Sequence, residues 1–88
     1  MSYSFFLSLL IFDLMDKPYH KKVVKLGERI KSVRLSNGLT QVQLASMCDV
    51  DIRTIQRIEV GTSVMSVIIL FKIAKVLEVS TEELIKEL

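Results

Sequence analysis

The stretch LTQVQLASMCDVDIRTIQRIEVG, residues 39–61, has the pattern of two short helices joined by a tight turn. Thr40 and Gln43 have the spacing of a capping box, in which each side chain bonds the other's backbone N–H. This pair predicts a helix that begins at Gln41. The residues of this helix that recur at helical spacing, and that we expect to face a core, are Leu44, Met47 and Cys48.

The second half of the stretch predicts the turn and the second helix. Asp49 stands where the chain must turn, and Asp tolerates a left-handed backbone better than most residues. Asp51 can cap a second helix that ends at about Val60, and Gly61 provides a stop. The two helices together predict a helix-turn-helix over residues 41–60. Ile55 and Ile58 are expected to face inward.

Residues 26–88 resemble the phage-repressor/Cro-like family of helix-turn-helix regulators, also called the XRE family. The resemblance rests on the ordered residues L39-T40-Q41, L44-A45, V50, T54-I55, R57-I58-E59, G61, S66, L70, K72-I73-A74-K75 and L77 to L84. It implies an all-α fold, a compact five-helix bundle of the lambda-repressor-like type. It also implies binding to double-stranded operator DNA, commonly as a homodimer.

Local signals predict the other helices. A first helix is expected over residues 23–36, ended by Asn37 and Gly38, and a fourth over residues 66–77. Ser80 can cap a fifth helix, with Glu83 completing a second capping box. No alternation typical of strands is evident.

Arg53 and Arg57 lie one turn apart on the outer face of the second motif helix, and Arg can bond guanine O6 and N7 bidentately. We therefore predict that these two residues contact bases, with Thr54 and Gln56 as weaker candidates. Ile52 occupies a position that often contacts bases in the family. Two interpretations of Ile52 stay open, an apolar contact to a thymine methyl and packing at the edge of the core. The alternative for the arginines is a plain solvated surface.

Phosphate contacts are predicted at the ends of the motif. The family resemblance assigns such a contact to Gln41, and helix N-termini favour phosphate in any case. Thr62 and Ser63 follow the second helix and are weaker candidates.

The resemblance also implies an internal salt bridge between Arg34 and Glu59, which would make Glu59 structural; the alternative is that both are exposed. Cys48 occupies an apolar position of the family and is expected to be a small buried hydrophobe.

Composition fits a single small domain. The chain has 88 residues, half of them apolar and a quarter charged, with a net charge of +2. Its one Cys excludes an internal disulfide and predicts a reducing, cytoplasmic location. We expect no metal, no cofactor and no catalysis, because neither zinc-type spacing nor a catalytic arrangement is evident.

Charge is distributed unevenly along the chain. Residues 17–34 hold seven Lys or Arg against one acid, whereas residues 78–88 hold four Glu and one Lys. A basic segment of this kind suits contact with phosphate, although it also fits a solvated helix face.

Residues 1–16 form an apolar N-terminal extension to a domain over residues 17–88. Its run from Phe5 to Phe12 is too short to span a bilayer as a helix. Four interpretations stay open: packing on the fourth helix, part of a dimer interface, weak membrane anchoring, or a true start at Met15. The fourth helix is itself unusually apolar. The candidate packing or dimer surface comprises Phe5, Phe6, Leu9, Leu10, Ile68 and Ile69.

The sequence thus predicts a non-enzymatic, DNA-binding transcriptional regulator that binds a two-fold operator as a homodimer. The alternative is a protein-interaction module, such as an antitoxin that binds a toxin. The apolar surplus favours the alternative, and the Arg53 and Arg57 face favours DNA.

Overall fold

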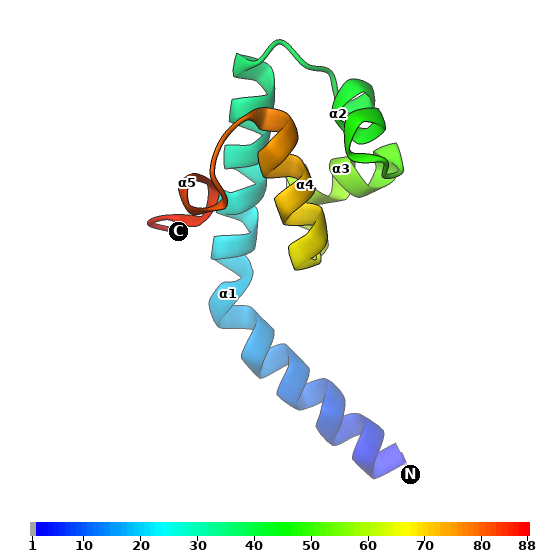
Figure 1. Ribbon diagram of the computed structural model, residues 1–88. Helices are drawn as coiled ribbons and strands as arrows, with labels where there is room; N and C mark the ends of the chain where they lie inside the picture. The colour runs from blue at the N-terminus through cyan, green and yellow to red at the C-terminus, as the bar shows by residue number, and fades with distance from the viewer. Residues whose placement is uncertain (1) are drawn as a thin grey trace.

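The computed structural model describes the backbone of residues 2–88 and the side chains of residues 19–88. The chain forms five helices in the order α1 (Ser2–Ser36), α2 (Gln41–Cys48), α3 (Ile52–Val60), α4 (Val67–Leu77) and α5 (Thr81–Ile85). Helices α2 to α5 gather around the C-terminal half of α1 (Figure 1). The predicted all-α bundle of five helices is confirmed, and residues 2–88 contain no strand.

All five helices contribute to one core. Its buried apolar residues are Ile30, Leu44, Ala45, Cys48, Ile55, Ile58, Ile73, Ala74, Leu77 and Leu84. The prediction that Met47 faces this core is wrong, because its side chain is 58% exposed. Leu44 and Cys48, four residues apart, set the inward face of the short helix α2, and Met47 falls to the side of that face.

Helix α1 is much longer than the predicted helix over residues 23–36. It begins at Ser2, and its N-terminal part extends away from the other four helices (Figure 1). Residues 2–17 contain neither Gly nor Pro, so this run holds no residue that would end a helix before Ser2 is reached. Phe5, Phe6, Leu9 and Leu10 lie outside the residues whose side chains are described. In the described part of the chain, none of the helices is long and apolar enough to cross a bilayer.

The predicted caps of the two motif helices are present. The Thr40 hydroxyl accepts from the Gln43 N–H at 3.1 Å, and the Gln43 side chain accepts from the Thr40 N–H at 2.8 Å. Asp49 adopts the left-handed conformation, with φ of 57°, and Asp51 caps α3 through the Arg53 N–H. The capping box thus fixes the start of α2, and Asp49 and Asp51 fix the two ends of the turn between α2 and α3.

The second predicted capping box is only half formed. The Ser80 hydroxyl accepts from the Glu83 N–H at 3.0 Å, as expected. The Glu83 carboxylate, however, accepts from Lys86 Nζ at 3.3 Å. The ion pair with Lys86, three residues along the chain, therefore holds the Glu83 side chain away from the Ser80 N–H that a capping box requires it to bond.

Gly27 allows α1 to touch the backbone of α3. A Cβ at this position would lie 2.2 Å from the Ile58 carbonyl oxygen and 3.0 Å from that of Glu59. Gly61 ends α3 with φ of +75° and packs on Val24 of α1. A Cβ at Gly61 would lie 2.8 Å from a Val24 methyl group. The end of α3 therefore rests on the α1 backbone at Gly27 and on Val24 at Gly61.

We expect Gly27→Ala to lower the free energy of unfolding by about 1–3 kcal/mol, because the two backbones must separate to admit a methyl group. This figure is the net effect, since the higher helix propensity of Ala than of Gly offsets up to about 1 kcal/mol of the loss. Urea denaturation followed by circular dichroism measures it. Glu28→Ala, an exposed change on the same turn, is the matched control and should be nearly neutral. A Gly27→Ala variant as stable as the parent would contradict the close approach.

Candidate nucleic-acid interface

Helix α3 has a buried side and an exposed side. Ile55, Ile58 and Glu59 are 5% exposed or less and face the bundle. Arg53, Gln56 and Arg57 are exposed on the opposite side. Positions three and four residues apart share a helix face, so these three polar side chains form one outward surface. We call this surface the α3 face.

A buried ion pair holds α3 in its orientation. Arg34 Nε lies 2.6 Å from Glu59 Oε2, and Arg34 Nη2 donates to Glu59 Oε1 at 3.0 Å. The two side chains are 6% and 1% exposed. Arg34 Nη1 also donates to the Leu39 carbonyl at 2.7 Å. The structure thus brings together the two residues that the sequence analysis pairs, and joins the end of α1 to the end of α3.

Gln41 belongs to the same network. Its side-chain Nε2 donates to Glu59 Oε1 at 3.0 Å, so the N-terminus of α2 is tied to the Glu59 carboxylate as well. From the sequence, only a phosphate contact is predicted for Gln41, and this bond is not. An amide nitrogen carries two N–H groups, and one of them remains for a phosphate oxygen.

The other expected DNA contacts differ in exposure. Ile52 and Thr54 are half-buried, and Ile52 packs against the core. Thr62 is exposed, with its hydroxyl 3.4 Å from the Arg57 carbonyl, and Ser63 is half-buried. Of the five residues expected to contact bases, the three on the α3 face are therefore the most exposed.

Two cations of the basic segment are engaged within the protein. Arg29 Nη1 donates to the Leu84 carbonyl at 2.9 Å and to the Lys86 carbonyl at 2.5 Å, which ties α5 to α1. Arg34 is the partner of Glu59. The exposed lysines that the structure describes in this segment are Lys21, Lys22, Lys25 and Lys31. The positive surface of α1 is therefore smaller than the sequence alone indicates.

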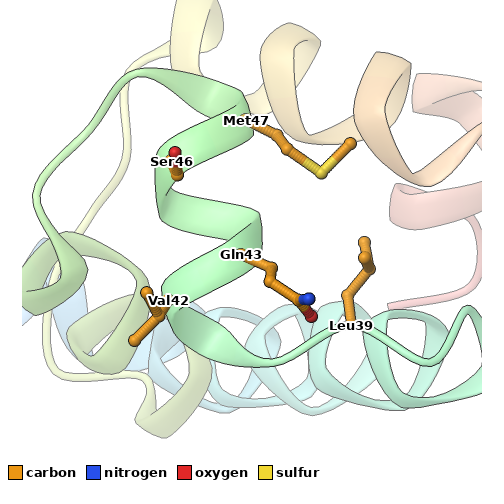
Figure 2. A pocket seen from close by; sticks show the side chains of 5 residues that line it. All are labelled: Leu39, Val42, Gln43, Ser46 and Met47. Carbon is orange, nitrogen blue, oxygen red and sulfur yellow. The ribbon is translucent and has the colours of Figure 1, made fainter.

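A shallow pocket lies on the outer side of α2 (Figure 2). Its volume is about 290 Å³, and its lining residues are Leu39, Val42, Gln43, Ser46 and Met47. Figure 2 shows the side chains of Gln43 and Met47 extending from one side of α2, and Leu39 standing on the segment before the helix. These five residues include neither a charged nor a strongly nucleophilic side chain, so the pocket suits apolar contact and not catalysis.

Cys48 is 2% exposed. Burial raises the pKa of the Cys48 thiol, and the positive charge of Lys72 offsets this only in part. A thiol with a raised pKa is a poor nucleophile at neutral pH, so Cys48 acts as a buried apolar side chain.

We expect Glu59→Leu to lower the free energy of unfolding by about 3–5 kcal/mol, because it leaves the Arg34 guanidinium buried and unpaired. The double variant Arg34→Met, Glu59→Leu should recover most of this loss, since both charges are replaced by apolar groups of similar size. Urea denaturation of the two variants decides between them. Equal losses in both would show that the ion pair is not what holds α3.

Comparisons with known proteins agree with this geometry. A helix-turn-helix family model matches residues 30–84, which include all of α2, α3 and α4. The chain is also similar to the crystal structure of the restriction-modification controller protein C.AhdI from Aeromonas hydrophila. The TM-score is 0.69 at 31% sequence identity, and the match covers 70% of this chain and 94% of that one. A comparison with curated proteins gives no match. The chain belongs to the XRE-type helix-turn-helix family of DNA-binding transcriptional regulators.

Proposed function

We propose that this protein regulates transcription by placing α3 in the DNA major groove and reading base edges with the α3 face. The observation that carries the proposal is the division of α3 into two sides. One side is buried and fixed by Glu59, while Arg53, Gln56 and Arg57 are exposed on the other. A rigidly held helix with exposed hydrogen-bonding side chains is what recognition of base edges requires.

The chemistry of the α3 face indicates which bases it would read. Arg53 and Arg57 can each bond guanine O6 and N7, and Gln56 can bond adenine N6 and N7. Ile52 and Thr54 lie at the margin of this face, and Ile52 could contribute an apolar contact to a thymine methyl. Gln41, Thr62 and Ser63 are the proposed phosphate contacts that would set the register of the helix on the duplex.

We further propose that the protein binds a two-fold operator as a homodimer, with half-sites about 34 Å apart. Exposed apolar residues on α4 support an interface, since Ile68 and Phe71 are 66% and 55% exposed. Ile69, the neighbouring candidate for this surface, is instead half-buried against the core.

The similarity to a restriction-modification controller protein favours a role of the same kind, control of restriction-modification genes. A protein-binding role is the second candidate, and the apolar pocket on α2 favours it, because Val42 and Met47 are 62% and 58% exposed there. The two roles make different predictions for the selection of bound DNA.

The decisive experiment is selection of bound sequences from random DNA at physiological salt. We expect an inverted repeat, which would establish both sequence-specific binding and two-fold symmetry. Recovery of no preferred sequence, together with retention of fold, would contradict the proposed function and favour the protein-binding role.

We expect Arg53→Ala and Arg57→Ala each to weaken binding to the selected sequence by about 1–3 kcal/mol and to relax preference at one base pair. Lys86→Ala is the matched control for loss of one positive charge. Lys86 lies just beyond α5, which packs mainly on α1 and α4. Fluorescence anisotropy on the selected and on scrambled duplexes measures the effect. Equal losses on both duplexes would contradict base reading by these arginines.

Lys21, Lys22 and Lys25 are exposed on the turns of α1 next to Val24, which packs on Gly61 at the end of α3. We expect their joint replacement by Gln to weaken binding to selected and scrambled DNA alike. The slope of log affinity against log salt should become shallower by about 0.9 for each phosphate that the variant no longer neutralises. An unchanged slope would place these lysines away from the DNA.

A further inference from the structure

We propose that the N-terminal arm of α1, residues 5–12, docks into an apolar groove on a second copy of the chain. The groove lies between α1 and the start of α4. The inference rests on the proposed homodimer and identifies the segment that holds it together. It follows from an open apolar groove, an apolar arm on a continuous helix, and a geometry that keeps the arm from its own groove.

The groove is apolar and of a definite size. Its apolar lining residues include Val23, Leu26, Val64, Val67 and Leu70, and its volume is about 140 Å³. An apolar cavity of about 150 Å³ can hold a benzene molecule, so one aromatic ring suits this space. Val64 and Val67 at its rim are 78% and 63% exposed. Among the residues whose side chains are described, none that lines the groove is charged.

The arm has matching chemistry. Residues 5–12, FFLSLLIF, contain three Phe, three Leu and one Ile and no charge. A buried Phe, Tyr or Trp covers about 150–250 Å². A specific interface buries about 800 Å² on each partner. Two such arms, exchanged symmetrically, bring enough apolar surface to reach that area.

The arm cannot reach the groove of its own chain while α1 stays helical. Val23 and Leu26 line the groove and belong to the same helix as the arm. At about 1.5 Å per residue, residue 9 lies roughly 20 Å along the axis from Val23. The N-terminal part of α1 extends away from the other four helices (Figure 1), so the groove that the arm can fill is that of another copy.

The reach of α1 agrees with the proposed operator. The part of α1 before Val23 is roughly 30 Å long. Two recognition helices on one face of DNA lie about 34 Å apart. An arm of this length can therefore bridge two copies bound at neighbouring half-sites, and an exchanged pair of arms keeps the two-fold symmetry of an isologous dimer.

The test begins with two variants studied without DNA, so that it can fail independently of DNA binding. The first lacks residues 1–14, and the second is Val64→Asp, which places a charge at the rim of the groove. Among the residues whose side chains are described, those of the core and those packed on it lie between Leu26 and Leu84. The matched part of this chain also covers 94% of the C.AhdI chain, so the truncated bundle is expected to fold. Val42→Asp, on α2 and outside the groove lining, is the control, since Val42 is 62% exposed against 78% for Val64.

Sedimentation equilibrium should show a dimer for the full chain and for Val42→Asp. The dimer dissociation constant should rise about tenfold or more in each of the two test variants. An equimolar mixture of the truncated chain and Val64→Asp should regain a dimer. One partner supplies an intact groove and the other an intact arm, and only an exchanged arm produces this rescue.

Three results would overturn the proposal. An unchanged dimer after truncation would show that the arm is not at the interface. A monomeric full chain whose melting temperature falls on truncation would place the arm on its own bundle. Flotation of a monomeric full chain with phosphatidylglycerol vesicles, lost on truncation, would assign the arm to a membrane surface. Circular dichroism of each variant confirms that it is folded.

Discussion

The orientation of α3 depends on one buried carboxylate. Glu59 accepts hydrogen bonds from Arg34 on α1 and Gln41 on α2, so three helices meet at a single charged group. Buried ion pairs seldom add much net stability, because desolvation offsets the attraction. They are costly to break on one side, however, which disfavours arrangements in which the partners separate. The effect here is geometric: Glu59 points inward, and the arginines of the α3 face point out.

The ion pair works together with a close backbone contact about two turns away along α1. Gly27 lets the carbonyl groups at the end of α3 rest on α1, and Gly61 then turns the chain toward α4. The missing side chain at Gly27 brings Arg34, farther along α1, within reach of Glu59. A bulkier residue at position 27 would therefore move the carboxylate as well as the helix.

The sequence predicted what is local and missed what depends on contacts between helices. Thr40, Gln43, Asp49 and Asp51 act within a few residues of themselves, so their capping roles could be predicted directly. The only sequence signal for the contact at Gly27 is a glycine inside a predicted helix, a placement that costs about 1 kcal/mol against Ala. Met47 was misplaced because spacing alone does not say how much of a short helix is covered. The hydrogen bond from Gln41 to Glu59 could not be predicted, because it depends on the fold bringing the two residues together.

The division of α1 into two parts links the interface to assembly. Its C-terminal half is fixed by Gly27, Arg29 and Arg34, each of which contacts another helix. Its N-terminal half changes direction and extends away from the bundle (Figure 1), but it belongs to the same helix, so fixing α3 on α1 also limits where the arm can lie relative to the α3 face. A single recognition helix reads only a few base pairs, and a longer operator needs two of them in a set relation. A stiff arm set by the same helix that positions α3 is a direct way to impose that relation.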